Sequence, residues 1–142
     1  MKFSKRIHYG FVFLMQLHYA WPGYKAVKEL ADADDLPHKF LEGIASDFRK
    51  GKFVEVKRGA QGGYRLVKPL EEITFLEVLR CLDPEWERQK REDGHNDKSP
   101  KQETVNLFLK QTSRSVDQVF GEITLDTLTA LHKHDDSLMY YI

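Results

Sequence analysis

The chain has 142 residues, enough for one domain or one domain with an appendage, and its composition is that of a globular protein, with 41% hydrophobic and 31% charged residues. No apolar run approaches the roughly 20 residues of a membrane-spanning helix, and no small-residue cleavage site follows the first apolar patch, so we expect neither a membrane protein nor a signal peptide. The single cysteine, Cys81, excludes an intrachain disulfide and suits a reducing cytoplasm, where we expect the protein to reside.

The formal net charge of zero hides an uneven distribution. Residues 1–70 carry 13 Lys and Arg against 7 Asp and Glu, whereas residues 71–142 carry 9 against 15. A basic half joined to an acidic half is expected when only one half meets a polyanion.

Three helices are predicted within the first fifty residues. Residues 5–20 follow Ser4, a suitable N-cap, and carry apolar side chains at helical spacing until residues 21–23 (WPG) end the helix. A shorter helix over residues 24–31 leads through a polar turn into a third helix over residues 37–50. The side chains predicted to face the core from the third helix are Phe40, Leu41, Ile44, Ala45 and Phe48.

A β-hairpin is predicted next. Residues 53–56 and 64–67 alternate like strands, and the stretch 57–66 (KRGAQGGYRL) holds three glycines and three cationic side chains. A basic, glycine-rich tip suits a phosphate-lined groove, although a solvated hairpin with no partner has the same sequence. Helix, turn, helix and hairpin in this order indicate a winged helix-turn-helix, so the predicted fold class is mostly α with a small β-hairpin.

Beyond the hairpin, the pattern changes from ordered to highly charged. Thr74 followed by Glu77 is a capping-box pattern and predicts a fourth helix over residues 74–82. Residues 83–102 contain two prolines, a glycine and eleven charged residues, which predicts a mobile or partly ordered linker.

The last forty residues contain two further predicted helices. A long amphipathic helix covers residues 103–120, and a short one covers residues 125–132. The long helix either pairs with its copy in a second chain, which we favour, or packs within its own chain. The predicted domains are a DNA-binding winged helix-turn-helix (1–82), a charged loop or linker (83–102), and a dimerisation helix with a C-terminal tail (103–142).

The third helix carries polar residues opposite its apolar stripe, namely His38, Lys39, Glu42 and Lys50. A recognition helix inserts its N-terminal residues into the major groove, where Lys reads guanine acceptors and Glu can accept from a cytosine amino group. Glu42 is the most informative, because an acid facing DNA weakens binding unless it reads a base. Each of these residues could also be an ordinary solvated side chain.

The predicted wing supplies a second set of candidates. Arg58 and Gln61 lie at its tip, and we expect Arg58 to insert into a narrow minor groove. Phosphate contacts are predicted for Lys57, Arg65, Lys5, Arg6 and Lys25. The full set of predicted DNA-binding residues is His38, Lys39, Glu42, Lys57, Arg58, Gln61, Tyr64, Arg65, Lys5, Arg6 and Lys25.

Several motifs resemble those of the Rrf-two (BadM-like) family of bacterial transcriptional regulators, closely over residues 1–82 and loosely beyond. They are residues 1–6 (MKFSKR), 40–44 (FLEGI), 47–51 (DFRKG), 58–66 (RGAQGGYRL) and 71–74 (EEIT) with the LEVL that follows. The resemblance implies a homodimer on a palindromic operator, with Glu42 and Arg58 at base- or groove-reading positions and a long C-terminal dimerisation helix.

The same resemblance raises the question of a cofactor. Many members of the family hold an iron–sulfur cluster with three cysteines in the loop before the long helix, but residues 83–102 contain none. Cys81 alone cannot supply a normal cluster ligand set, so we expect no cluster, although His8 matches a position near which some relatives supply a non-cysteine ligand. Cys81 could instead be a redox sensor, or simply a buried helix cysteine, which we favour.

Other potential ligands are weaker. His132 and His134, followed by Asp135 and Asp136, could form a metal cluster, but two histidines at i and i+2 do not share a helix face, so we expect a solvated tail and no metal site.

The expected function is a cytoplasmic, homodimeric DNA-binding transcriptional regulator, most simply a repressor. No nucleophile–base pair or phosphate loop is present, so we do not expect an enzyme. A partner sensor protein is compatible with the resemblance to cysteine-metabolism repressors of the family. The alternatives are a winged-helix protein–protein interaction module, or a DNA-binding sensor that depends on a cluster or metal.

Overall fold

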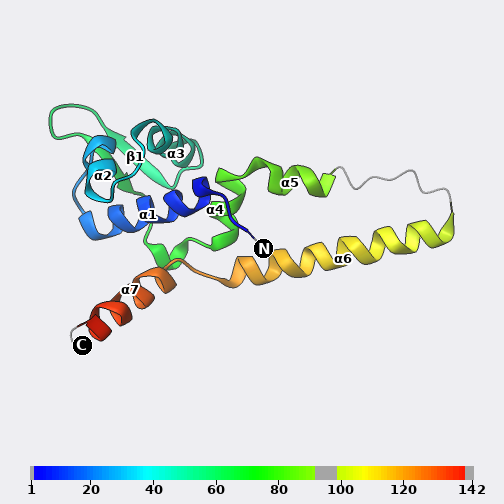
Figure 1. The fold of residues 1–142 in the computed structure, drawn as a ribbon. Coiled ribbons are helices and arrows are strands. Elements are labelled where there is room, and N and C mark those ends of the chain that lie inside the picture. The colour runs from blue at the N-terminus through cyan, green and yellow to red at the C-terminus, as the bar shows by residue number, and fades with distance from the viewer. Residues whose placement is uncertain (1, 92–98, 140–142) are drawn as a thin grey trace.

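The computed structural model describes residues 2–91 and 99–139, which form seven α-helices, one 3-10 turn and one antiparallel hairpin (Figure 1). The elements in chain order are α1 (Lys5–Ala20), α2 (Val27–Ala33), α3 (His38–Lys50), β1 (Val54–Lys57), β2 (Gly63–Leu66), η1 (Leu70–Glu72), α4 (Phe75–Leu82), α5 (Pro84–Arg91), α6 (Pro100–Glu122) and α7 (Asp126–Met139). This order confirms the predicted winged helix-turn-helix and its fold class.

The core joins α1, α3, α4 and the base of the hairpin. Phe13 and Leu17 of α1 and Phe48 of α3 are fully buried, and the rings of Phe13 and Phe48 stack at 5.8 Å between centroids. Burying side chains of this size stabilises the fold by about 1.5–3 kcal/mol each. The recognition-helix candidate α3 is therefore held by its apolar face, which leaves the opposite face to solvent.

Local signals account for both helix starts that the sequence specified. The Ser4 hydroxyl accepts a hydrogen bond from the Ile7 amide at 3.3 Å, which confirms the N-cap of α1. At α4, the Thr74 hydroxyl accepts from the Glu77 amide (3.2 Å) and the Glu77 carboxylate accepts from the Thr74 amide (2.7 Å). The predicted capping box is confirmed.

Two predictions about α2 and α3 are wrong. The second helix covers residues 27–33 rather than 24–31, because Lys25 is extended and pairs with Tyr64 of β2 as a β-bridge. Phe40 does not face the core: it is 39% exposed and contacts Tyr9 edge-to-face at 5.5 Å. Its place at the margin of the apolar stripe lets its ring pack over the outside of α1.

The prediction of a linker over residues 83–102 is also wrong for residues 84–91, which form α5. Glu, Arg, Gln and Lys are good helix formers, so a dense run of charges is compatible with a helix. Arg88 pairs with Glu85 at 2.7 Å within α5, and Trp86 packs against Phe120 of α6. Residues 92–98 of the predicted linker lie outside the described residues.

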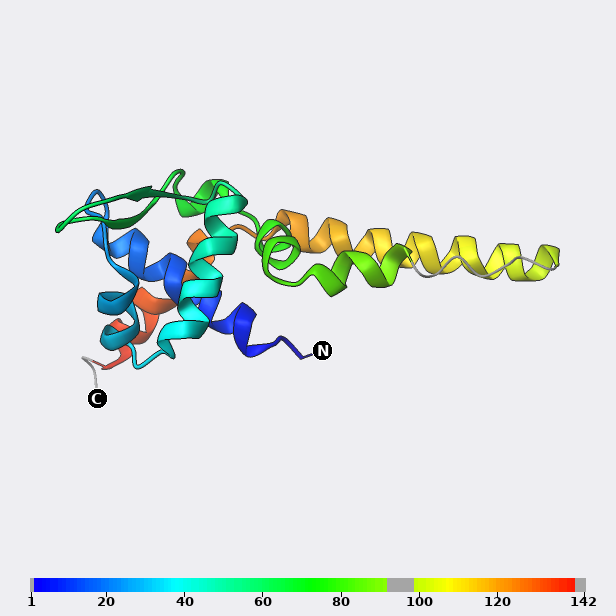
Figure 2. The ribbon, with the colours of Figure 1, turned by 90° about the horizontal axis from the view of Figure 1, so that it is seen from above.

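The C-terminal helices are longer than predicted. Ser99 caps α6, which starts at Pro100 instead of residue 103, and α7 extends to Met139 instead of residue 132. The C-terminal end of α6 packs on α4, with the rings of Phe75 and Phe120 4.9 Å apart, while the rest of α6 projects from the body (Figure 2).

Candidate nucleic-acid interface

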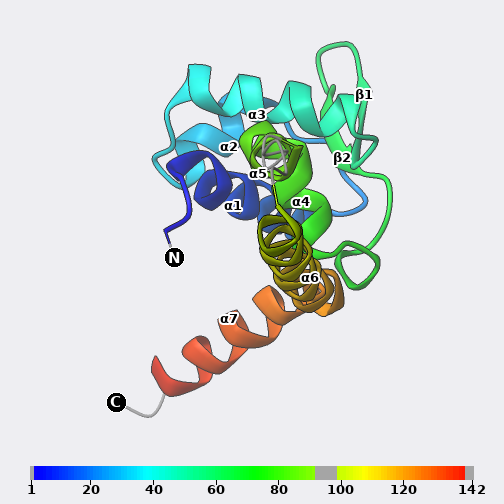
Figure 3. The same cartoon turned by 90° about the vertical axis from the view of Figure 1, so that its right-hand side faces the viewer.

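The outer face of α3 is a polar ridge. Leu41, Ile44, Ala45 and Phe48 are buried, so the helical repeat turns the residues between them toward solvent. The ridge consists of Lys39, Glu42, Gly43, Ser46 and Lys50, of which all but the half-buried Gly43 are exposed. Figure 3 shows α3 and the hairpin on one side of the molecule, with α6 and α7 on the other.

The predicted residues of α3 differ in their local partners. The His38 ring nitrogen Nε2 lies 2.9 Å from Asp32 Oδ1, which ties the start of α3 to the preceding helix. The side chains of Lys39 and Glu42 make no hydrogen bond or ion pair with any part of the chain that the structure describes. Their side chains are therefore available to a partner.

Gly43 and Ser46 are ridge residues that the sequence reasoning missed. They lie four and seven positions after Lys39, a helical spacing that could have identified them. A Cβ atom at Gly43 would meet only Arg6 Nη1, at 3.6 Å, so the internal packing does not require a glycine there.

The wing tip requires its glycines. Gly59 and Gly63 have φ angles of +118° and +147°, a conformation that side chains disfavour. A Cβ atom at Gly63 would lie 2.2 Å from the carbonyl carbon of Lys25. This turn leaves Arg58 and Gln61 exposed, with no polar partner among residues 2–91 and 99–139.

The base of the wing is fastened to the segment between α1 and α2. The Lys25 amide donates to the Tyr64 carbonyl (3.0 Å), and the Tyr64 amide donates to the Lys25 carbonyl (2.8 Å). The half-buried Tyr64 ring packs edge-to-face on Phe13, so its side chain contributes to packing. The Lys25 ammonium lies 3.6 Å from the Glu29 carboxylate, and the Lys25 side chain remains 44% exposed.

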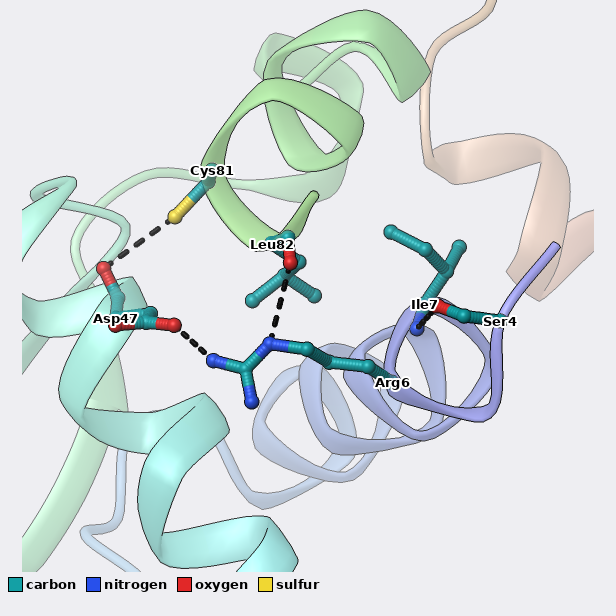
Figure 4. A network of polar contacts seen from close by, with 6 residues as sticks. All are labelled: Ser4, Arg6, Ile7, Asp47, Cys81 and Leu82. Carbon is teal, nitrogen blue, oxygen red and sulfur yellow. Dashed lines mark hydrogen bonds and ion pairs between the residues drawn. The ribbon is translucent and has the colours of Figure 1, made fainter. Parts of the chain in front are cut away.

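Two predicted phosphate contacts are occupied by intramolecular partners. Arg65 pairs with Glu55, its neighbour across the hairpin, and holds the pKa of the Glu55 carboxyl below its usual value, with a hydrogen bond from the Tyr24 hydroxyl acting in the same direction. Arg6 pairs with Asp47 of α3, and its Nε donates to the Leu82 carbonyl at 3.1 Å (Figure 4).

Lys5 and Lys57 keep their charge at the surface. Lys5 is exposed at the start of α1, and the Lys57 ammonium lies 5.6 Å from the centre of the Tyr24 ring while the residue stays exposed. Lys57 therefore lies next to the wing tip. Lys5 lies at the N-terminal end of α1, opposite to the end that leads to the segment bound to the wing.

The surroundings of Cys81 favour its neutral thiol. Its thiol donates to the Asp47 carbonyl at 3.3 Å (Figure 4), and burial, reinforced by the Asp47 carboxylate, raises its pKa to about 11. A thiol that stays protonated at neutral pH is a poor nucleophile and a poor metal ligand.

The remaining potential ligands do not converge. Across the described residues, no group of three or more His, Cys, Asp and Glu side chains is arranged to hold a metal ion. His132 contacts the Tyr19 ring at 5.7 Å between centroids, and His8 is exposed beside Tyr9. None of the helices among the described residues has the length and apolarity needed to cross a bilayer.

Comparison with known proteins identifies the family. Residues 3–131 match the Rrf2 (Rrf-two) family model, described as an iron-dependent transcriptional regulator. The chain belongs to the Rrf2 family. The match extends over the winged helix-turn-helix, α5, α6 and part of α7.

Individual relatives agree with this assignment. A Mycobacterium tuberculosis protein named as an HTH-type transcriptional regulator, Rv1287, is 38% identical over 85 residues, which are 58% of this chain and 52% of that protein. The structure of CymR, the global cysteine regulator of B. subtilis, superimposes with a TM-score of 0.68 at 24% identity, covering 92% of this chain and 98% of CymR. The structure of IscR from T. potens gives a TM-score of 0.68 at 25% identity, covering 92% and 87%. The chain matches only about half the length of the first of these relatives.

The donor set does not fit a cysteine-ligated iron–sulfur cluster of the kind found in the Rrf2 family. The chain has one cysteine, Cys81, whose half-buried thiol donates to the Asp47 carbonyl and has a pKa raised by burial to about 11, which disfavours the thiolate. Three thiolates cannot come from one chain of this sequence.

Proposed function

We propose that this Rrf2-family protein binds double-stranded DNA sequence-specifically and represses transcription as a homodimer on a palindromic operator. The observation that carries the proposal is the free ridge of α3 beside a wing whose tip presents Arg58. Both lie in the basic half of the chain, on the side away from α6 and α7 (Figure 3).

In this proposal, α3 enters the major groove. Lys39 donates to guanine acceptors, and Glu42 accepts from a cytosine amino group. His38 lies at the start of the same helix, where its contact with Asp32 sets the direction of its ring. The absence of polar partners for Lys39 and Glu42 within the described fold supports this assignment, because neither has to give up an internal contact to bind a base.

The wing approaches the neighbouring minor groove. Arg58 inserts there, Gln61 lies beside it at the tip, and Lys57 contacts a phosphate. Lys5 and Lys25 supply further phosphate contacts. We leave Arg6, Tyr64 and Arg65 out of this set, because their half-buried side chains are held by partners within the fold. The ion pair of Lys25 with Glu29 is more exposed, at 44% and 59% of the two side chains, so it opens at little cost.

Dimerisation takes place through α6. The projecting helix exposes apolar side chains that nothing in the described chain covers, and a second copy of α6 would bury them. They are Val105 (53% exposed), Phe108 (66%), Leu109 (46%) and Val119 (55%), which share one face of the helix, whereas Leu107 (56%) lies on the opposite side.

The protein works in the cytoplasm without catalytic activity and without a cluster. The single, protonated cysteine supports the absence of an iron–sulfur cofactor. A separate sensor protein would then convey the signal, because the chain lacks the family's usual sensing ligands.

The experiment is operator binding by fluorescence anisotropy, with a duplex selected by the wild-type protein from random-sequence DNA. Glu42→Ala should mainly relax base preference, whereas Arg58→Ala should weaken binding to all duplexes and lower the slope of log affinity against log salt by about 1. Lys101→Ala removes an exposed cation from α6 and serves as the control. If binding shows no salt dependence, or Arg58→Ala binds like wild type, the DNA-binding wing is refuted, and the protein-interaction module becomes the better reading.

A further inference from the structure

The side chain of Arg65 joins the hairpin to the rest of the domain. Its Nε donates to Glu55 Oε1 at 2.8 Å, its Nη2 also donates to Glu55, and its Nη1 donates to the Pro22 carbonyl at 3.4 Å. All three guanidinium nitrogens therefore have partners within the chain, although a phosphate contact would need some of them free.

Two aromatic rings complete the arrangement. The Arg65 guanidinium lies 4.4 Å from the centre of the Tyr24 ring and 5.1 Å from that of Trp21, distances at which a cation is attracted to a ring. The Tyr24 hydroxyl donates to the same Glu55 oxygen at 3.2 Å. Trp21, Pro22 and Tyr24 belong to the segment between α1 and α2, so these contacts connect the two strands of the wing to the helix-turn-helix.

A connection at this place controls where the wing tip lies. Ala60, in the turn of the hairpin, is five residues from Arg65, so it lies at most about 16 Å away at 3.3 Å per residue. A rotation of the hairpin by about 10° at its base would move the tip by about 3 Å. This displacement equals the donor–acceptor distance of a hydrogen bond, so it is large enough to break a contact made by the tip. The buried Val54 and Leu66 and the backbone bridge between Lys25 and Tyr64 hold the base against the core. The contacts of Arg65 add the link between the exposed side of the strands and the segment between α1 and α2, which limits rotation about that base.

We propose that Arg65 is a positioning residue, which acts with Glu55, Trp21 and Tyr24 to hold the wing at the angle that lets Arg58 reach DNA. This inference rests on the proposed function of the wing. The pair of Arg65 and Glu55 is neutral as a unit, so the charge that the wing offers DNA comes from Lys57 and Arg58.

The decisive variant is Glu55→Gln, which keeps Arg65 and removes a negative charge near the DNA. If Arg65 contacts phosphate, releasing it should tighten operator binding. If Arg65 positions the wing, operator affinity should fall about tenfold, the size of one lost DNA contact, and affinity for a scrambled duplex should fall with it, as it should for Arg58→Ala. Glu71→Gln makes the same charge change at an exposed residue of η1 and should leave operator affinity within about twofold.

The same substitution in an Arg58→Ala background tests whether Glu55 acts through the tip. Glu55→Gln should then have less than about a twofold further effect, because the contact that it would misplace is already absent. Thermal unfolding of each variant checks that the domain remains folded, and Arg65→Lys, which keeps the charge but loses the planar fork, should reproduce the loss.

The outcomes separate the two proposals. Unchanged or tighter operator binding by Glu55→Gln, with Arg58→Ala still weakening it, overturns the positioning role and leaves the wing proposal standing. An equal loss in both backgrounds also overturns it, because Glu55 would then act away from the tip. If Arg58→Ala itself has no effect, the proposed function of the wing fails first, and the positioning role fails with it.

Discussion

Replacement of Gly63 by alanine is the most sharply defined perturbation of the wing. A Cβ atom there would lie 2.2 Å and 2.3 Å from the carbonyl carbon and oxygen of Lys25, and 2.6 Å from the Ala26 nitrogen. These are backbone atoms, so no side chain can swing aside. The φ angle of +147° adds strain that a glycine does not experience.

The expected cost follows from the contacts that must give way. Moving the Lys25 segment weakens two backbone hydrogen bonds of 3.0 and 2.8 Å, each contributing about 1 kcal/mol, and the backbone strain costs at least about 1 kcal/mol more. A loss of about 3 kcal/mol should lower the unfolding midpoint by about 10 °C in a domain of this size.

Thermal unfolding followed by circular dichroism, at one fixed protein concentration, measures this loss. Gly59→Ala is the matched control, because a Cβ atom there meets nothing within 4 Å and only the φ of +118° disfavours it. It should cost about 1 kcal/mol. If both variants unfold at the same temperature, the close approach of Gly63 to the Lys25 backbone does not cause the predicted loss of stability.

Three further outcomes are expected. The alkylation rate of Cys81 by iodoacetamide should still rise between pH 9 and its pKa of about 11, because partial burial disfavours the thiolate; a plateau near pH 9 in folded protein would contradict the raised pKa. Phe108→Glu should convert a dimer to monomer in sedimentation, whereas Lys110→Glu on the same helix should not, and a Phe108→Glu dimer would rule out this face as the interface. Gly43→Ala should stabilise the fold by about 1 kcal/mol while weakening operator binding several-fold; unchanged binding would mean that the ridge of α3 does not approach DNA closely.

The sequence predicted the elements whose signals are local. The N-cap at Ser4, the capping box at Thr74 and the glycine-rich turn of the wing each depend on a few neighbouring residues, and the structure confirms all three. The sequence was less informative for α5. Its high density of charge was interpreted as disorder, although the residue types of α5 favour a helix.

Long-range partners could not be predicted from one sequence. Arg6 and Arg65 looked like phosphate contacts because each is a cation in the basic half. Asp47 lies 41 positions from Arg6, and Glu55 faces Arg65 only after the hairpin has formed in its register. Nothing in the spacing of the chain reports such pairs, so the candidate site included cations that the fold uses internally.

In α3, the residues that anchor the helix in the core are different from the residues that the helix presents to solvent. Leu41, Ile44 and Phe48 secure the helix from one side, while the exposed side chains of Lys39 and Glu42 on the other side make no hydrogen bond or ion pair within the described fold. Substitutions at the latter two positions therefore change what the helix presents without loosening how it is held. Under the proposed function, a new operator preference could then be acquired one residue at a time, with little loss of stability at any step.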